Sequence, residues 1–244
     1  MAERHSVIIR RLTDDQAEAA GAYRFFSNES VSLDALKAAL LRHCRSLTGE
    51  GHKLVIQDTT QLNFDHLAER LGTSHGCTYH GLGVIGDNAS LGCFLHPSLV
   101  VYAAPQQAAP QQASFQPCYG LSDIRLWTRP DVRPDKHERQ YQKQPIKEKE
   151  SFRWIESIAV SEAVLDGGGP LTMVADREAD IFEVFARVPG ERTDLLVRAA
   201  RNRQISETAG LLYGHINKQA VAGCYSVEVR GDRRRNRTAY KAAS

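Results

Sequence analysis

The chain has 244 residues, of which 42% are hydrophobic and 25% are charged, and its formal net charge at neutral pH is +2. This length suffices for one large domain or two small ones, and the composition is that of a globular protein rather than a disordered one. No run approaches the roughly 18 apolar residues that a membrane-spanning helix needs, so we do not expect an integral membrane protein.

The five cysteines are too scattered to suggest a disulfide framework or a zinc ribbon, because they are odd in number and include no C-x-x-C pair. The first twenty residues contain acids and arginines but no apolar stretch of the kind found in secretory signals. We therefore expect a soluble protein in the reducing environment of the cytoplasm.

The first half of the chain predicts one helix followed by three strands. Apolar residues at three- and four-residue spacing predict a helix over 28–47, capped by Asn28 or Ser30. A low-complexity Ala/Gln/Pro segment at 103–117 predicts a flexible insertion between two of the strands. The strands themselves are expected at 53–64, 92–102 and 123–129.

The second half predicts alternating helices and strands. The sequence DGGGP at 166–170 is typical of the end of a helix, and a short apolar strand follows it. Helices are expected at 146–165, from Asp176 to about 187, and at 206–218, and strands at 171–175, 194–200 and 225–231.

This order of elements favours an α/β fold with a mixed sheet flanked by helices. Three successive strands joined by loops favour antiparallel pairing, whereas a strand–helix–strand alternation favours parallel pairing. One sheet satisfies both when the first three strands form a meander and the fourth returns beside the first through a right-handed crossover. The expected topology is therefore ribonuclease-H-like.

Two aspartates each follow a hydrophobic strand, Asp58 after KLVIQ and Asp176 after LTMVA. If these strands are neighbours, the two carboxylates converge at one edge of the sheet, where they could hold a hard divalent cation. Magnesium accepts one or two carboxylates together with phosphate oxygens, and two such ions can assist a phosphoryl displacement. The alternative is that each aspartate serves only as a turn residue or helix N-cap.

Basic residues suggest a polyanionic partner. Arg177, directly after Asp176, could contact a phosphate or offset the neighbouring acids. Near the end of the chain the sequence RGDRRRNRTAYK could bind phosphates through forked arginine hydrogen bonds, or could equally be a solvated turn or tail. The arginines concerned there are Arg233, Arg234, Arg235 and Arg237.

Five segments, in order, resemble the bacterial DDE transposases of the Tn-five type, which are encoded by insertion sequences. The motifs D-T-T at Asp58 and D-R-E-A-D at Asp176, joined by an E-K-E-S helix, are the most specific part of this similarity. The segments are AYRFFSNESVSLDAL (22–36), QDTTQLNF (57–64), EKESFRWIES (148–157), VADREADIFEVF (174–185) and LLVRAARNRQI (195–205).

The resemblance implies a ribonuclease-H-like core that cuts and joins DNA with two Mg²⁺ or Mn²⁺ ions held by two aspartates and a glutamate. Asp58 and Asp176 match the two aspartates and would be both metal ligands and catalytic residues. Arg198 matches a basic strand-end position that faces DNA, and we expect Arg201 to contact DNA as well. Lys147, Lys149 and Trp154 resemble the helix before the second aspartate, with no chemistry assigned to them.

The third carboxylate of the family has no counterpart here. In the family this glutamate belongs to a Y-x-x-R-x-x-x-E pattern, which does not occur in this sequence. Glu178 could be considered as a substitute, but it follows the same strand as Asp176 and should point elsewhere. The expected organisation is a shortened helical N-terminal region at 1–50, a core at 51–205 with a flexible insertion and polar linker at 103–145, and the start of a β-rich insertion with a basic tail at 206–244.

The expected function is therefore cut-and-paste DNA transposition by metal-dependent phosphoryl transfer, in a chain that is incomplete and inactive by itself. The alternative is a non-catalytic DNA-binding remnant or an inhibitor of a full-length transposase; a nuclease-like domain with another role is a third reading. The expected partners are transposon-end and target DNA and either a second copy of the chain or a full-length transposase, without a membrane.

Overall fold

The computed structural model describes residues 8–66, 82–86, 90–103, 118–129, 143–206, 208, 210–221, 223–224, 226–229 and 240–243. Most of the predicted insertion and linker at 103–145 lies outside these residues, as do Arg233, Arg234, Arg235 and Arg237. The chain divides into two compact units, Met1–Ala199 and Ala200–Ser244.

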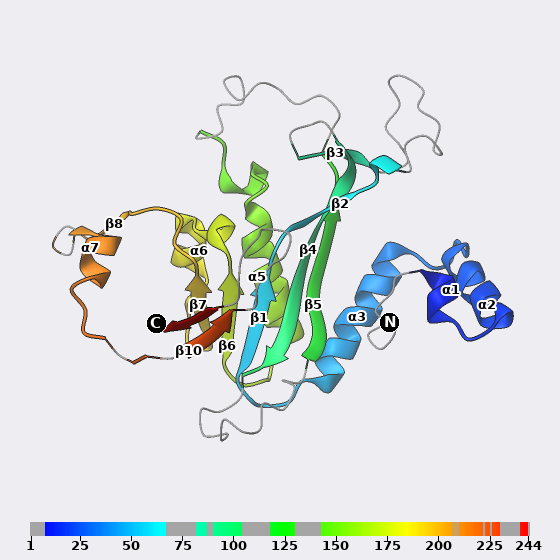
Figure 1. Cartoon of the computed structure of the whole chain (residues 1–244), viewed down its shortest axis with the longest axis horizontal. Helices are drawn as coiled ribbons and strands as arrows, with labels where there is room; N and C mark the ends of the chain where they lie inside the picture. Colours follow the sequence, from blue (N-terminus) through cyan, green and yellow to red (C-terminus); the bar gives the residue numbers. More distant parts are fainter. Residues whose placement is uncertain are drawn as a thin grey trace. The chain divides into compact units, whose positions relative to one another are not determined.

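A mixed sheet of seven described strands forms the centre of the first unit (Figure 1). Its strands are β1 (Lys53–Gln57), β2 (Thr60–Asn63), β3 (Gly83–Ile85), β4 (Ser90–Tyr102), β5 (Cys118–Trp127), β6 (Leu171–Ala175) and β7 (Thr193–Val197). Neighbours follow the order β2-β4-β1-β6-β7, and β3 and β5 pair with β4 as well. Strand β4 is antiparallel to all its partners, whereas β1, β6 and β7 are parallel to one another.

The predicted pairing of the strands is confirmed. Strands β1, β4 and β5 form the antiparallel meander, and β6 returns to lie parallel beside β1. The β-rich run at 53–64 forms two strands, because β1 ends at Gln57, directly before Asp58, and β2 begins at Thr60. At the break, the Thr59 amide donates to Asp58 Oδ1 over 2.7 Å, a local side-chain bond of the kind that competes with sheet pairing.

Helices cover one face of the sheet and form the hydrophobic core with it. The helical elements of the first unit are α1 (Ile9–Leu12), α2 (Gln16–Phe26), α3 (Leu33–Leu47), η1 (Ile146–Glu148), α5 (Phe152–Val164), η2 (Arg177–Ala179) and α6 (Phe182–Arg187). Cys44 of α3, Trp154 of α5 and Val184 of α6 are each fully buried in the same cluster as Val55 and Met173 of the sheet. Helices α3, α5 and α6 therefore pack against the same sheet face.

The opposite face of the sheet is apolar and exposed where β1 and β7 end. By strand alternation, Ile56 and Leu196 lie on the face opposite Val55 and Leu195, and they are 38% and 60% exposed. By the same alternation, the residues directly after β1, β6 and β7 belong to this face.

The predicted helix at 28–47 is wrong in where it begins. Helix α3 starts at Leu33, and its cap is Ser32, whose Oγ accepts from the Ala35 amide over 3.1 Å. Asn28 instead accepts from the Ser30 amide, in a turn that separates α3 from α2. Helix α2 has its own cap, Asp15, which was not singled out in the sequence.

The second unit contains short elements. They are β8 (Gln204–Ser206), β9 (Gly210–Leu211), α7 (Leu212–Ile216), β10 (Ser226–Val229) and β11 (Tyr240–Ala243). The predicted helix at 206–218 is wrong in its first half, because β9 occupies Gly210–Leu211 and α7 begins only at Leu212. Gly210 itself has a φ of +72°, a left-handed conformation that glycine adopts easily. Strand β10 corresponds to the predicted strand at 225–231 and pairs with β11. Among the described residues, no helix has both the length and the apolar character needed to cross a membrane.

Candidate functional site

Asp58, Asp176 and Arg198 form a row across three neighbouring strands. The in-register parallel pairing of β1, β6 and β7 ends with Gln57 beside Ala175 and Ala175 beside Val197. Each charged residue is the next one along its strand, and the Arg198 amide continues the ladder by donating to the Ala175 carbonyl over 3.2 Å. Since neighbouring strands lie about 4.8 Å apart, the three backbones are adjacent at the carboxyl edge of the sheet.

The row lies on the side of the sheet opposite the core helices. Gln57 is buried, and Ala175 and Val197 pack against the core cluster. Because side chains alternate along a strand, the next residues belong to the other face. Asp58 and Arg198 are exposed and Asp176 is half-buried, so solvent and ligands have access to this row.

Each aspartate also has a local structural role. Asp58 Oδ1 accepts from the Thr59 amide over 2.7 Å, and Asp176 Oδ1 accepts from the Glu178 amide over 2.8 Å as the N-cap of η2. The turn and cap roles considered for these residues in the sequence are therefore present. Each role uses one carboxylate oxygen, and within the described residues no hydrogen bond engages the second oxygen of either aspartate.

The donor set fits a hard divalent cation that receives its remaining ligands from water and substrate. Mg²⁺ is commonly bound by one or two carboxylates plus phosphate oxygens, and two carboxylates on adjacent strands meet that need. Within the described ranges, no group of three or more His, Cys, Asp or Glu side chains is arranged to hold a metal ion. Asp58 and Asp176 are the two carboxylates of this row.

Glu178 does not extend this row. Its carboxylate accepts from Arg153 Nη2 over 2.6 Å, which directs it toward the start of α5. Arg177, in the same turn of η2, is exposed and makes no such contact with α5 among the described residues. The expectation that Glu178 points away from the aspartates is in keeping with this contact.

The start of α5 is linked to the ends of several strands. Arg153 donates from Nε to Thr59 Oγ1 over 3.1 Å and from Nη1 to the Glu150 carbonyl over 2.8 Å. The Glu150 carboxylate in turn accepts from Nε and Nη2 of Arg129, which follows β5, over 2.5 and 2.6 Å. The carboxyl ends of β1, β5 and β6 are thus connected through the first turn of one helix.

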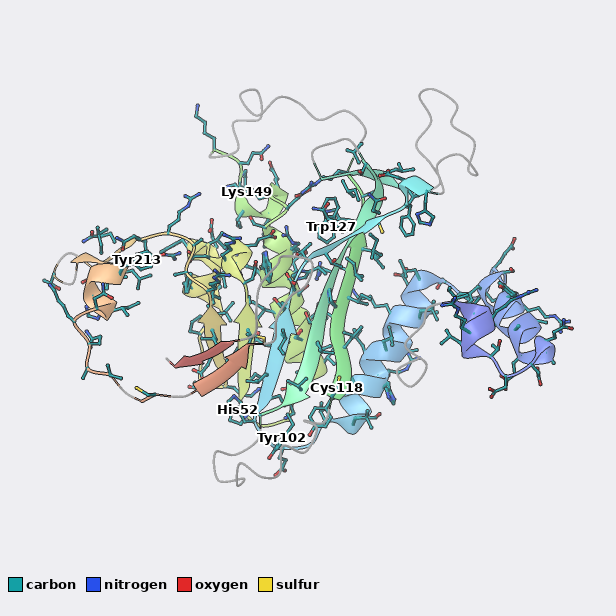
Figure 2. The ribbon with its side chains drawn as sticks, viewed as in Figure 1. His52, Tyr102, Cys118, Trp127, Lys149 and Tyr213 are labelled. Carbon is teal, nitrogen blue, oxygen red and sulfur yellow. The ribbon has the colours of Figure 1, made fainter. Side chains whose placement is uncertain are left out.

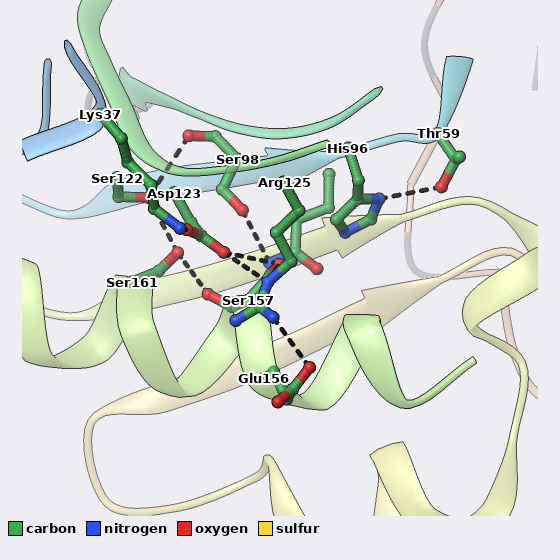
Figure 3. Close-up of polar contacts among 11 residues, drawn as sticks. Lys37, Thr59, His96, Ser98, Ser122, Asp123, Arg125, Glu156, Ser157 and Ser161 are labelled. Carbon is green, nitrogen blue, oxygen red and sulfur yellow. Dashed lines mark hydrogen bonds and ion pairs between the residues drawn. The ribbon is translucent and has the colours of Figure 1, made fainter. Parts of the chain in front are cut away.

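A buried polar network lies further inside the same unit, between β4, β5, α3 and α5 (Figure 3). Asp123 is fully buried and forms ion pairs of 2.8 Å with Lys37 and with Arg125, while Ser157 Oγ donates to it over 2.8 Å. Burial by itself raises the pKa of Asp123, but the bonds from Lys37 and Ser157 and the charge of Arg125 outweigh it and lower the pKa below its ordinary value. The network stabilises the core and does not reach the row of charged residues.

Two hollows border the start of α5. One, of about 410 Å³, is lined by residues that include Arg129, Lys149, Glu150, Arg153 and Glu178. The other, of about 420 Å³, lies beside β5 and shares Lys149, Glu150 and Arg153 with the first. Trp127 and Lys149 lie at this end of the sheet, and His52 and Tyr102 lie at the opposite end (Figure 2). Neither of these two hollows is lined by Asp58 or Asp176.

The remaining candidate residues belong to the second unit. Arg201 is exposed and belongs to the second unit, while the four arginines at 233–237 lie outside the described residues. Arg153 was not identified from the sequence, although a signal existed: a cation in the first turn of a helix opposes the helix dipole and so requires nearby acids. Glu178 is such an acid, because its carboxylate accepts from Arg153 Nη2.

A comparison with models of known protein families finds none that matches this chain.

Proposed function

We propose that the row of Asp58, Asp176 and Arg198 is the metal- and phosphate-binding site of a DDE-type transposase core with a ribonuclease-H-like fold. The observation that carries this proposal is the register of β1, β6 and β7, which makes these three residues neighbours at one edge of the sheet. Strand order and the resemblance of the D-T-T and D-R-E-A-D motifs support the same assignment.

In this proposal, Asp58 and Asp176 hold Mg²⁺ or Mn²⁺, while Arg198 and the exposed Arg177 bind DNA phosphates. A bound divalent ion would supply charge stabilisation for the phosphoryl group and lower the pKa of a coordinated water. The two arginines act by orienting the phosphodiester through charge-assisted hydrogen bonds. Because a site of two carboxylates holds a second ion weakly, we expect negligible strand transfer by this chain alone.

The test is whether Mn²⁺ and DNA bind to the same site. A cation shared between the aspartates and a phosphate must strengthen DNA binding, and by reciprocity DNA must strengthen Mn²⁺ binding. We expect the DNA dissociation constant, measured by fluorescence anisotropy at fixed ionic strength, to decrease when Mn²⁺ is added. Asp58→Asn should remove this decrease while leaving DNA binding without Mn²⁺ intact.

Asp194→Asn is the matched control, because Asp194 is an exposed acid on the same strand and sheet face as Arg198. It removes one negative charge without removing a proposed ligand, so the response to Mn²⁺ should persist. An equal loss of the response in both variants, or no response in the unaltered chain, would contradict the proposed site.

The second candidate is a non-catalytic DNA-binding protein that regulates or inhibits a full-length transposase. It is favoured by the two-carboxylate site, because the described residues contain no group of three acidic, His or Cys ligands. In that case affinity comes mainly from the arginines at 233–237 and depends steeply on salt. Replacing Arg233, Arg234 and Arg235 with alanine should flatten the salt dependence of DNA binding, and an unchanged slope would exclude this candidate.

A further inference from the structure

Arg153 connects the two turns that contain the aspartates. Its Nε donates to the side chain of Thr59, the residue after Asp58. Its Nη2 donates to the carboxylate of Glu178, two residues after Asp176. The third contact, to the Glu150 carbonyl, holds Arg153 against the turn that precedes α5. One side chain therefore links β1, β6 and α5 at the edge where the aspartates lie.

The geometry is that of a held side chain rather than a mobile surface arginine. The Arg153 side chain is 14% exposed, and all three of its donor nitrogens have partners within 3.1 Å. Its guanidinium also lies 5.3 Å from the centre of the Trp127 ring and 5.6 Å from that of Trp154. A planar group with fixed donors can set the separation of two loops in a way that a flexible ammonium cannot.

The partners of Arg153 act on the aspartates through short backbone connections. The amide of Thr59 donates to Asp58, and the amide of Glu178 donates to Asp176. Thr59 and Glu178 therefore each make two such contacts. The backbone amide of each donates to an aspartate, and the side chain of each accepts from Arg153. A shift of Arg153 would therefore move both carboxylates.

We propose that Arg153 is a positioning residue that sets the separation and orientation of the Asp58 and Asp176 carboxylates for a shared divalent cation. The proposal rests on the proposed function, since it takes that row as the metal site. Arg153 itself touches neither the cation nor the substrate. Outer-shell partners of metal ligands typically contribute a factor of about 10 to 100 in metal affinity, and we expect an effect of that order here.

The experiment measures Mn²⁺ affinity by calorimetry on the full chain, with Mn²⁺ as the only ligand. Arg153→Met removes all three donors while keeping an unbranched side chain, and should weaken Mn²⁺ binding by about tenfold or more. Arg153→Lys keeps the charge but not the fork, so it should restore only part of the affinity.

Arg192→Met is the matched control for a general loss of stability. Arg192 is also partly buried and also bridges elements of the same strand–helix–strand unit, through Asp166 and the Leu165 carbonyl at the far end of α5. It should lower the melting temperature without changing Mn²⁺ affinity. If both arginine variants weaken Mn²⁺ binding equally, Arg153 has no positioning role.

Two further variants each remove one of the side-chain acceptors of Arg153. They keep the test valid even if Arg153→Met does not fold. Thr59→Val removes the acceptor in the first turn, and Glu178→Ala removes the acceptor in the second, while both amide bonds to the aspartates remain available. Each should weaken Mn²⁺ binding. Glu178→Ala should not add to the effect of Arg153→Met, because both remove the same bridge, whereas Thr59→Val also removes the contact to His96 Nδ1.

The results distinguish a failure of the positioning role from a failure of the proposed metal site. Mn²⁺ binding that Asp58→Asn abolishes but Arg153→Met and the two acceptor variants leave unchanged would overturn the positioning role and leave the proposed site standing. Absence of Asp58-dependent Mn²⁺ binding in the unaltered chain would overturn both.

Discussion

His96 is a fully buried histidine that contacts Thr59, the residue after Asp58. Its Nδ1 lies 2.9 Å from Thr59 Oγ1, and its ring meets the edge of Trp154 at a centroid distance of 4.5 Å. Burial, together with the positive charges of Arg153 and Arg125, lowers the pKa of His96 to about 4, although the charge of Asp123 acts in the other direction. His96 is therefore uncharged in the folded protein at neutral pH.

This lowered pKa predicts a loss of stability in mild acid. An unfolded histidine gains a proton near pH 6.5, whereas folded His96 does so only near pH 4, so the unfolded state binds more protons between these values. The free energy of unfolding should decrease by about 3 kcal/mol as the pH falls from 6.5 to 4. Chemical denaturation at a series of pH values measures this change.

The control for this titration is His96→Asn, which keeps a polar group near Thr59 but does not titrate. Carboxylates contribute equally to both proteins, so only the difference between the two pH profiles belongs to His96. Parallel profiles would show that His96 is not held neutral by the fold.

At the scale of single elements, helices α3 and α5 contribute polar groups to the core. Helix α3 contributes Lys37 to the ion pair with buried Asp123, and helix α5 contributes Ser157 to the same carboxylate. Where α3 begins is set by Ser32, whose side chain caps the helix. Breaking this cap should loosen the turn that precedes Lys37.

Ser32→Ala should lower the free energy of unfolding by about 1 kcal/mol, because the Ala35 amide loses its capping acceptor. Ser30→Ala, two residues earlier, removes an exposed hydroxyl outside the helix and should have almost no effect. Urea denaturation of the two variants distinguishes them. A larger effect of Ser30→Ala would place the start of the helix where the sequence pattern had suggested.

At the scale of the whole first unit, the sequence predicts the strands and their neighbours well because each strand is a short apolar run bounded by turn residues. The adjacency of Asp58 and Asp176 could be inferred from the strand–helix–strand order before the register was known. The separate strand β2 could not, since Thr60–Asn63 continues the same β-rich composition. The local bond from Thr59 to Asp58 that interrupts the strand leaves no periodic signal.

The connections between distant segments were beyond the reach of the sequence. Lys37, Asp123 and Ser157 come from three elements and meet only when these pack together. Arg153 is similar, because its partners Thr59 and Glu178 lie 94 and 25 residues away along the chain. Periodicity and motif spacing report on local structure, whereas such contacts depend on how the whole sheet is assembled.

The central claim is that Asp58 and Asp176 bind one divalent cation at the carboxyl edge of β1 and β6. Anomalous diffraction from crystals of the full chain grown with Mn²⁺ tests it most directly. We predict an anomalous peak within coordination distance of both carboxylates, absent from crystals of Asp58→Asn. A peak elsewhere, or none at this edge at saturating Mn²⁺, would contradict the claim.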